Sequence, residues 1–310
     1  MFRFFFTLLL SFQFCSAEII EDKFHRAENH AYRGFTHEKQ GDWTGPFFFI
    51  QMADCQLGMI EKNISWDKEI FLLKQAVDHI NRLKPKFVIV CGDLTNAKPF
   101  KPAYDEQVAD YKRIMSRVSD DIPLVCICGN HDVGNKPKKE TIASYEEHFG
   151  SHYLSFWVGG VQCFGLNSSL IFNPRNAPDI YEEQKAWIHQ EMERTFALNP
   201  KHRIVFTHHP WFLIHPKKLT FPIFEIPVER RIEMLDLFLR QNVTICFAGH
   251  YHRNAYGLYQ GMEMVTTAAL GKPLGGDRSG FRVVKVFEDR IEHDYFGLDE
   301  MPVEINLKDN

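Results

Sequence analysis

An apolar run of strand length, Ile122 to Cys128, ends abruptly in the polar sequence Gly129-Asn-His-Asp132. Four other apolar runs have a similar length and also stop at aspartate, glutamine or histidine. Their polar ends are Asp54-Cys-Gln56, Cys91-Gly-Asp93, His208-His209-Pro210 and Gly249-His-Tyr-His252. Short continuous apolar runs indicate strands that are buried on both faces of a sheet. The sequence therefore predicts five buried strands, each with polar side chains at its carboxyl end.

Helical patterns lie between these strands. Within Trp66 to Leu83, the apolar residues Ile70, Leu73, Val77 and Ile80 have the spacing of one helix face. Further helices are predicted at Tyr104 to Val118, Thr141 to Phe149, Tyr181 to Phe196 and Val228 to Leu239. The strands of this part are Phe47 to Ala53, Lys86 to Cys91, Leu124 to Cys128, Arg203 to Thr207 and Thr244 to Ala248. This alternation favours mostly parallel pairing with right-handed crossovers.

The middle and the end of the chain have a different pattern. Gly159-Gly160 separates two strand-like runs, Tyr153 to Val158 and Val161 to Leu166, which indicates a hairpin. The last fifty residues are expected to form antiparallel strands at Met262 to Thr267, Arg282 to Phe287 and Arg290 to Phe296. Two regions rich in strands predict two stacked, mixed sheets with helices outside. The expected fold is a four-layer α/β/β/α sandwich.

Length and composition favour one large domain. The chain has 310 residues, 45% hydrophobic content and no linker rich in proline, serine or glycine. We expect a globular domain at 46–300, preceded by an irregular lead-in at 18–45 and followed by a tail at 301–310. The net charge of −4, without a basic stripe, argues against a nucleic-acid-binding protein. The oligomeric state is left open.

The N-terminus resembles a secretory signal peptide. Met1-Phe-Arg3 is positively charged, Phe4 to Phe14 is mostly apolar, and Cys15-Ser-Ala17 ends in a small residue. The apolar stretch is shorter than the roughly 20 residues that cross a bilayer, and no later segment qualifies, so no membrane span is expected. Cleavage after residues 1–17 would place the protein in the secretory pathway or outside the cell. The alternative is an unprocessed N-terminus on a cytosolic protein.

The seven cysteines do not predict a disulfide framework. Cys15 would leave with the signal peptide, and the remaining six have no regular spacing. Several lie within apolar strands, where a thiol behaves as a small hydrophobic side chain. Cys55, beside Asp54, would make a nearby site sensitive to oxidation if it were exposed, but a buried thiol is the favoured interpretation.

The polar ends of the five strands have the composition of a metal site. They supply Asp54, Gln56, Asp93, Asn130, His208, His250 and His252. Each piece alone has another interpretation, such as a turn or a pair of surface histidines. As a set, carboxylate, imidazole and amide groups suit two divalent metals of borderline to hard character, and they converge beyond the carboxyl ends of an open sheet. Two such metals about 3.5–4 Å apart can hold hydroxide for in-line attack on a phosphoryl group.

These motifs resemble the five-part signature of the calcineurin-like metallophosphoesterase superfamily. The matching segments are Asp54-x-Gln56, Gly92-Asp93, Gly129-Asn-His-Asp132, His208 and Gly249-His-x-His252. The resemblance extends from about Trp43 to Asp299, so that 46–300 would be the metallophosphoesterase domain. It implies that Asp54, Asp93 and His252 hold a first metal. It further implies that Asp93, as the bridge, holds a second metal with Asn130, His208 and His250.

The resemblance also implies an activity. The expected enzyme hydrolyses phosphomonoesters, most specifically as a protein serine/threonine phosphatase, with two Mn, Fe, Zn or Mg ions. His131 would be the general acid that protonates the leaving oxygen, because imidazole titrates near neutral pH. Asn130, His131 and Arg253 would contact the substrate phosphate. Relatives in this group are cytoplasmic, in contrast to the signal-peptide prediction. The alternatives are a phosphodiesterase or nucleotidase of the same fold, or a weakly catalytic scaffold for phosphorylated partners.

Two positions depart from the superfamily pattern. Gln56 stands where histidine is usual, and its neutral amide oxygen is a poorer ligand for soft metals. Asn96 stands where related phosphatases have an aspartate that orients the catalytic histidine. Asp132 is a candidate replacement with a catalytic role, and the competing interpretation is a carboxylate that caps a loop. The sequence also leaves open whether His209 is a ligand in place of His208, and whether Arg253 forms a structural salt bridge.

Overall fold

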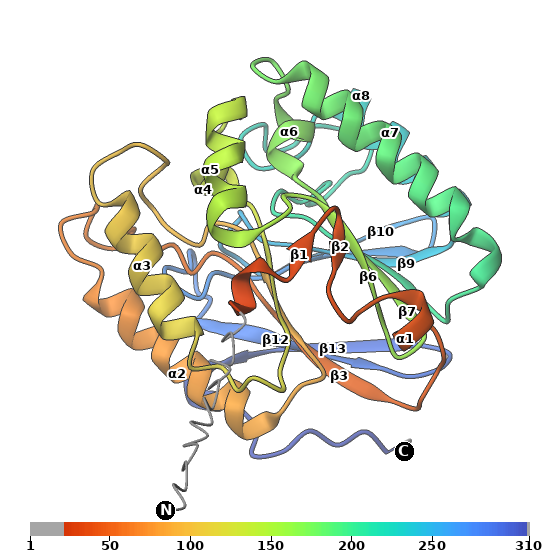
Figure 1. Ribbon diagram of the computed structural model, residues 1–310, viewed down its shortest axis with the longest axis horizontal. Helices are drawn as coiled ribbons and strands as arrows, with labels where there is room; N and C mark the ends of the chain where they lie inside the picture. The colour runs from red at the N-terminus through yellow and green to blue at the C-terminus, as the bar shows by residue number, and fades with distance from the viewer. Residues whose placement is uncertain (1–21, 309–310) are drawn as a thin grey trace, which may run out of the picture.

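The computed structural model describes residues 22–308, and Figure 1 shows how they are arranged. The predicted signal peptide at residues 1–17 lies outside the described residues, so its cleavage and the localisation stay predictions. Among the described helices, none combines the length and the apolar composition that a membrane crossing requires.

Five strands form the smaller sheet. They are β3 (Phe47–Met52), β4 (Val88–Cys91), β5 (Leu124–Ile127), β12 (Gly280–Val286) and β13 (Ile291–Gly297). Their order is β13-β12-β3-β4-β5. The strands β3, β4 and β5 are parallel, whereas β12 is antiparallel to both of its neighbours. The sheet is therefore mixed, as predicted.

Eight strands form the larger sheet, in the order β1-β2-β6-β7-β8-β9-β11-β10. They are β1 (Ala27–Glu28), β2 (Ala31–Tyr32), β6 (Leu154–Val158), β7 (Val161–Gly165), β8 (Arg203–Phe206), β9 (Val243–Ala248), β10 (Ala255–Tyr259) and β11 (Met262–Thr266). The strands β7, β8, β9 and β11 are parallel to one another. The predicted hairpin around Gly159-Gly160 is the antiparallel pair β6 and β7.

Helices cover the outer faces of both sheets. The four longest are α2 (Asp67–Leu83), α3 (Tyr104–Met115), α7 (Pro178–Arg194) and α8 (Val228–Arg240). Figure 1 shows α2 and α3 on one side of the stacked sheets and α7 and α8 on the other. Residues of α2 and α3 share a core with the smaller sheet, and residues of α7 and α8 share another with the larger sheet. The predicted four-layer sandwich is confirmed.

Alternating side chains on the strands join these layers. On β3, Phe47 and Phe49 face the larger sheet, whereas Phe48, Ile50 and Met52 face the helices. The ring of Phe49 lies 5.8–6.0 Å from two rings of the larger sheet, in edge-to-face contact with Phe206 and Phe247. Aromatic pairs of this geometry add to the free energy gained by burial. The contacts between the sheets thus fix how the ends of their strands meet.

Two sequence predictions about secondary structure were wrong in part. The lead-in at 18–45 contains a 3-10 helix (Lys23–His25), a short helix, α1 (His37–Gln40), and the strands β1 and β2. Ala31 of β2 pairs with Ser155 of β6, so the lead-in extends the larger sheet. Met262 to Thr267 does form a strand, β11, but its neighbours are β9 and the unpredicted β10 rather than β12. Short two-residue strands carry too little periodicity to be predicted.

Three further helices lie in the connections after β5 and β7. They are α4 (Asn130–Val133), α5 (Lys139–Phe149) and α6 (Ser168–Phe172). Only α5 was expected from the sequence. The six cysteines of the described chain are free and buried. Cys55 is 1% exposed, which matches the favoured interpretation of a buried thiol.

A buried histidine joins α5, β6 and the start of α6. His152 is 4% exposed, and its Nδ1 accepts a hydrogen bond of 3.1 Å from the side-chain amide of Asn167. The oxygen of that amide accepts from the backbone of Leu170, so the nitrogen must face His152. Burial lowers the pKa of His152 to about 3. This histidine is therefore neutral in the folded protein.

Because folded His152 is neutral, we expect the protein to lose folding stability as the pH falls. An unfolded histidine binds a proton near pH 6.5, whereas folded His152 does not until about pH 3. Between these values the unfolded state binds more protons, so the free energy of unfolding falls by about 1.4 kcal/mol per pH unit as pH drops. Urea unfolding of the chelated protein at several pH values should show a shallower dependence in His152→Asn than in wild type. His215→Asn, on the surface, is the control, and equal slopes for wild type and His152→Asn would refute the prediction.

Candidate metal centre

The predicted site residues lie at the carboxyl ends of β3, β4, β5, β8 and β9. Five of them have left-handed backbones, with φ of 53° at Asp54, 40° at Gln56, 51° at Asp93, 65° at His250 and 57° at His252. This conformation is uncommon for residues other than glycine, and such strain gathers at functional sites. Here it turns the chain sharply after β3, β4 and β9, so side chains far apart in sequence point to one place.

Two glycines allow the strand ends to approach one another. A methyl group on Gly129 would overlap Oδ1 of Asp93, and one on Gly249 would lie 2.5 Å from Oδ2 of Asp54. Both carboxylates are buried, with exposures of 0% for Asp54 and 1% for Asp93. The glycines are therefore required for the close packing of backbone against these carboxylates.

Asp93 lies at the centre of the cluster. Its Oδ1 accepts a hydrogen bond of 2.8 Å from the backbone N–H of His131. Its Oδ2 lies 3.3 Å from Nε2 of His208. The same His208 nitrogen lies 3.0 Å from Oδ1 of Asn130 and 3.1 Å from Nδ1 of His250. The structure thus brings together the residues that the sequence predicted for the second metal.

Asp54 forms a second group beside the first. Its Oδ2 accepts from the backbone N–H of His250 at 2.9 Å. Its Oδ1 lies 3.3 Å from Nε2 of His252 and 4.0 Å from Nδ1 of His208. The two carboxylates therefore share His208 as a neighbour.

Four imidazoles are held in the same way, each by one ring nitrogen and one backbone carbonyl. The pairs are His208 Nδ1 with Cys91 at 2.9 Å, His250 Nε2 with Ile223 at 3.0 Å, His252 Nδ1 with Lys272 at 2.7 Å and His131 Nδ1 with Asn96 at 2.6 Å. A carbonyl only accepts, so the bound nitrogen carries the proton and the other nitrogen is left for a ligand. Metal-binding histidines in proteins are typically oriented like this.

The charges in the cluster favour a cation. Burial opposes ionisation of Asp93, but the adjacent His208 and His131 outweigh it and hold the pKa of Asp93 below its usual range. Burial also opposes protonation of His208, yet Asp93 and Asp54 raise the pKa of His208 to about 9. Burial and His208 together lower the pKa of His250 to about 4. The two buried carboxylates thus draw positive charge to this cluster.

Two buried oxygen atoms of the site are available to bind a metal, because no hydrogen bond from the described part of the chain occupies them. Oδ1 of Asp54 and Oε1 of Gln56 have no hydrogen-bond partner among the described residues. A buried polar atom without a partner is costly, so each such atom calls for an explanation. Ligand atoms of Asp93, His208 and His250 lie within 4.8 Å of one another, close enough to share one ion. The residues present fit a divalent cation, including the amide of Gln56.

Asp132 is not the group that orients the His131 ring. Nδ1 of His131 is bound by the backbone carbonyl of Asn96. The Asp132 carboxylate instead accepts from the backbone N–H groups of Gly129, at 2.7 Å, and Leu94, at 3.0 Å. Burial and the adjacent Asp93 raise the pKa of Asp132 to about 7. Asp132 caps a loop and ties together the ends of β4 and β5, which supports the second of the two interpretations that the sequence left open.

His209 and Arg253 both lie next to predicted metal ligands in the chain. Nδ1 of His209 lies 3.1 Å from the hydroxyl of Ser168, and its ring stacks on Phe172 with centroids 4.7 Å apart. His209 therefore packs against Ser168 and Phe172 beside the cluster, which favours His208 as the ligand. Arg253 is exposed, its guanidinium lies 5.6 Å from the centre of the Tyr251 ring, and it forms no ion pair with a carboxylate within residues 22–308.

Sequence reasoning missed a cation beside the cluster. Nζ of Lys98 donates to Oδ1 of Asn135 at 2.7 Å, and the same oxygen accepts from Nδ2 of Asn130 at 3.2 Å. Lys98 is half-buried, and no carboxylate of the described chain pairs with it. Burial lowers the pKa of the Lys98 ammonium, while Asp93 acts in the opposite direction. Its position two residues after Asn96 is the only signal in the sequence.

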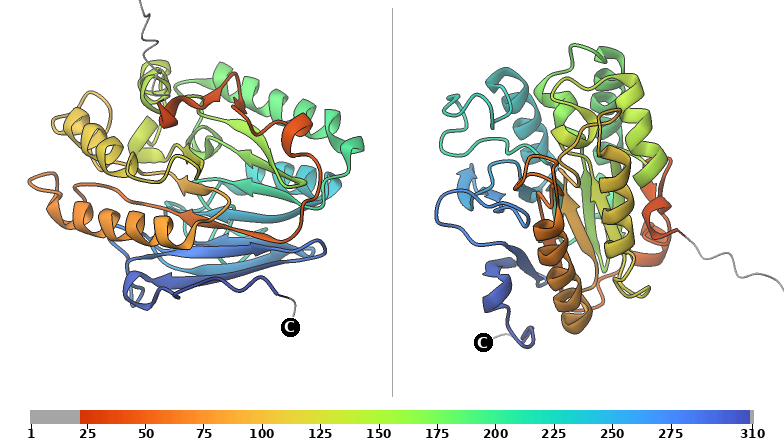
Figure 2. Two further views of the ribbon diagram at one scale, coloured as in Figure 1. Left: turned by 60° about the horizontal axis from the view of Figure 1, so that its bottom comes forward. Right: turned by 90° about the vertical axis from the view of Figure 1, so that its left-hand side faces the viewer.

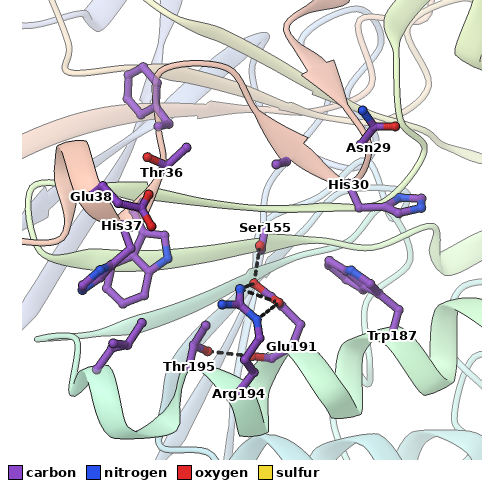
Figure 3. A pocket seen from close by; sticks show the side chains of 14 residues that line it. Asn29, His30, Thr36, His37, Glu38, Ser155, Trp187, Glu191, Arg194 and Thr195 are labelled. Carbon is purple, nitrogen blue, oxygen red and sulfur yellow. Dashed lines mark hydrogen bonds and ion pairs between the residues drawn. The ribbon is translucent and has the colours of Figure 1, made fainter.

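A separate cavity of about 430 Å³ lies between the lead-in and α7 (Figure 3). Two of its charged groups, Glu191 and Arg194, are paired with each other. The hydroxyl of Ser155 donates to Glu191 at 2.9 Å, and Arg194 binds the same carboxylate through two nitrogens. This cavity contains no cluster of metal-ligating side chains among the described residues. The group of side chains that could share an ion, Asp93, His208 and His250, lies at the strand ends instead.

Comparison with known proteins agrees with this geometry. The family model described as calcineurin-like phosphoesterase matches residues 49–254. A Bos taurus relative, serine/threonine-protein phosphatase CPPED1, is 41% identical over 90% of this chain and 92% of its own length. The Danio rerio protein of the same name is 39% identical over 91% of this chain and 94% of its own length.

Solved structures show the same fold. A dimetal phosphatase from Danio rerio superposes with a TM-score of 0.60 at 16% identity, covering 82% of this chain and 97% of that one. The purple acid phosphatase PPD1 from yellow lupin has a TM-score of 0.61 at 14% identity, covering 85% of this chain and 53% of that one. Together with the family match and the sequence identities, these observations show that the chain belongs to the calcineurin-like phosphoesterase family.

Proposed function

We propose that this phosphoesterase binds two divalent cations and removes phosphate from serine and threonine residues of proteins. The observation that carries the proposal is the pair of buried carboxylates, Asp93 and Asp54, that both lie next to His208. Asn130 and His250 adjoin His208 beside Asp93, and His252 adjoins Asp54. The substrate class is supported by the name of relatives that are about 40% identical over almost the whole chain.

The residues of each group have distinct roles in this proposal. Asp54, Asp93 and His252 would hold the first cation, and the free oxygen of Gln56 would complete its ligands. Asp93, Asn130, His208 and His250 would hold the second. When bound, the cations make water acidic enough to supply a nucleophile and offset the charge of the phosphoryl group. A neutral amide oxygen at Gln56 favours manganese or magnesium over softer metals.

His131 is suited to deliver a proton to the leaving oxygen. The carbonyl of Asn96 accepts the proton of Nδ1, so Nε2 is the nitrogen that exchanges a proton with substrate. The backbone N–H of His131 binds Asp93, which fixes the distance between this histidine and the metal ligands. The imidazole itself is thus oriented by the backbone carbonyl of Asn96, whereas the Asp93 carboxylate holds the backbone of His131.

Lys98 is suited to bind a phosphate oxygen. It is the half-buried cation beside Asn130, and Asn135 holds it there without neutralising its charge. An ammonium without a carboxylate partner is free to form a charge-assisted hydrogen bond with an anion. Arg253, the candidate from the sequence, is exposed and rests on the ring of Tyr251. We therefore assign phosphate binding to Lys98, with Arg253 as the alternative.

The first prediction concerns the metals. Chelation, or the change Asp93→Asn, should lower hydrolysis of p-nitrophenyl phosphate at least about 100-fold, because metal chemistry contributes several kcal/mol. Calorimetric titration with Mn²⁺ should show two ions per wild-type chain and fewer in the variant. Asp289→Asn, an exposed carboxylate, is the matched control. Full activity in a chelated sample would contradict the proposal. So would a phosphodiester or a nucleotide that is hydrolysed faster than phosphoserine peptides.

The second prediction concerns the leaving group. His131→Asn should slow hydrolysis of a phosphoserine peptide by roughly 10²- to 10⁴-fold, because the serine alkoxide needs a proton. The loss should be much smaller with p-nitrophenyl phosphate, whose leaving group is stable as an anion. Single-turnover rates on both substrates provide the measurement. Equal losses on both would show that His131 does not act as the acid.

The third prediction compares the two cations. Lys98→Met should raise KM for phosphomonoesters and the inhibition constant of inorganic phosphate about tenfold, because one charge-assisted hydrogen bond is lost. Arg253→Met should change both constants less. Steady-state kinetics with and without phosphate provide the measurement. A larger effect at Arg253 would restore the assignment made from the sequence.

A further inference from the structure

The segment 210–227, between β8 and α8, is a loop without a helix or strand beside the metal centre. The backbone carbonyl of Ile223 accepts from Nε2 of His250 at 3.0 Å. The ring of Phe224 makes an edge contact with the His250 ring at 5.5 Å. In the right panel of Figure 2 the loop stands at the same end of the molecule as the loop after β9. Whatever approaches the metal centre from this side must meet this loop.

A buried ion pair gives the loop a defined shape. Glu225 and Arg231 are both 0% exposed, and Nη2 of Arg231 lies 3.3 Å from Oε2 of Glu225. The Glu225 carboxylate also accepts from the backbone of Leu213 at 2.9 Å and of Thr220 at 3.0 Å. A buried charge requires such partners, because leaving it unpaired costs several kcal/mol. The carboxylate thus joins the two arms of the loop.

The guanidinium orders the same backbone from the other side. Nε of Arg231 donates to the carbonyl of Ile226 at 2.9 Å, and Nη1 donates to the carbonyls of His215 at 2.9 Å and Lys218 at 3.2 Å. The planar, many-donor geometry of arginine suits it to gather several carbonyls at once. The loop is irregular in secondary structure, but its backbone is fixed.

This fixed loop exposes large apolar side chains. Ile223 is 71% exposed, Ile214 53% and Leu219 42%. Lys217 and Lys218 are exposed between them, and neither pairs with a carboxylate of the described chain. Exposed apolar groups next to free positive charge mark a surface for a partner with apolar and acidic groups.

We propose that loop 210–227 is the docking surface for the substrate polypeptide. Apolar side chains beside the phosphorylated residue would pack on Ile214, Leu219 and Ile223, and acidic ones would pair with Lys217 and Lys218. This inference rests on the proposed protein phosphatase function, and it names the sequence context that the enzyme prefers. The contact between Ile223 and His250 places the surface next to the scissile bond, so one peptide reaches both.

The same chemistry could suit an anionic membrane surface. The direct contact of the loop with a predicted metal ligand favours the peptide, because a membrane on this surface would lie against the centre that has to receive substrate. A vesicle experiment distinguishes the two, since only membrane docking requires lipid.

The test uses the metal-loaded full chain with three substrates. These are p-nitrophenyl phosphate, a phosphoserine peptide with leucine and glutamate beside the phosphoserine, and a matched peptide with glycine and serine there. Wild type should prefer the leucine–glutamate peptide by about tenfold in kcat/KM, the gain expected from burying one or two apolar side chains. The triple variant Ile214→Ser, Lys217→Ser, Leu219→Ser should lose this preference and retain the aryl phosphate rate. Val303→Ser, 84% exposed, is the control.

Each contrary result overturns a separate statement. Equal kcat/KM for the two peptides in wild type, or an unchanged preference in the triple variant, would overturn the docking surface and leave the phosphatase proposal standing. Hydrolysis of the aryl phosphate without hydrolysis of either peptide would overturn the protein phosphatase function itself. Binding of wild type but not the triple variant to phosphatidylserine vesicles, with equal peptide rates, would replace the peptide with a membrane.

Discussion

The burial of the Asp93 carboxylate is the constraint on which the site depends. A buried anion must be compensated, and here the compensation comes from groups on other strand ends. Those strand ends meet only because two sheets pack face to face through Phe49, Phe206 and Phe247. The packed core thus supports five residues in a strained left-handed backbone. The packing that stabilises the core therefore also holds the side chains of the cation site in place.

Much of this could be predicted from the sequence, because burial leaves a clear pattern. A strand covered on both faces must be apolar throughout, so the polar residues after Cys91, Ile127 and Ala248 identify strand ends. The lead-in at 18–45 could not be predicted, because two-residue strands such as Ala27–Glu28 leave no period. The partners of β11 were also missed, since which strands pair is decided by tertiary packing rather than by local pattern.

The errors at the site have a common physical cause. The sequence displays side chains, whereas four imidazoles here are oriented by backbone carbonyls that any residue could supply. An aspartate was therefore sought for His131, and Asp132 was the nearest in sequence. The structure uses Asp132 to tie Gly129 to Leu94 and lets the carbonyl of Asn96 hold the ring. The side chain at position 96 is thereby free to differ from related phosphatases, since the contact that orients His131 does not involve it.

Loop 210–227 contacts the metal centre on one side and exposes side chains to solvent on the other. Through Ile223 the loop fixes His250, and through Glu225 and Arg231 it is itself fixed to α8. The loop accepts a hydrogen bond from the metal centre through the backbone carbonyl of Ile223, whereas the side chains at 214, 217 and 219 face solvent. Substitutions at such exposed positions can change what docks there without moving a ligand. A fold arranged in this way separates the chemistry, held by buried groups, from the choice of substrate, which is left to the surface of one loop.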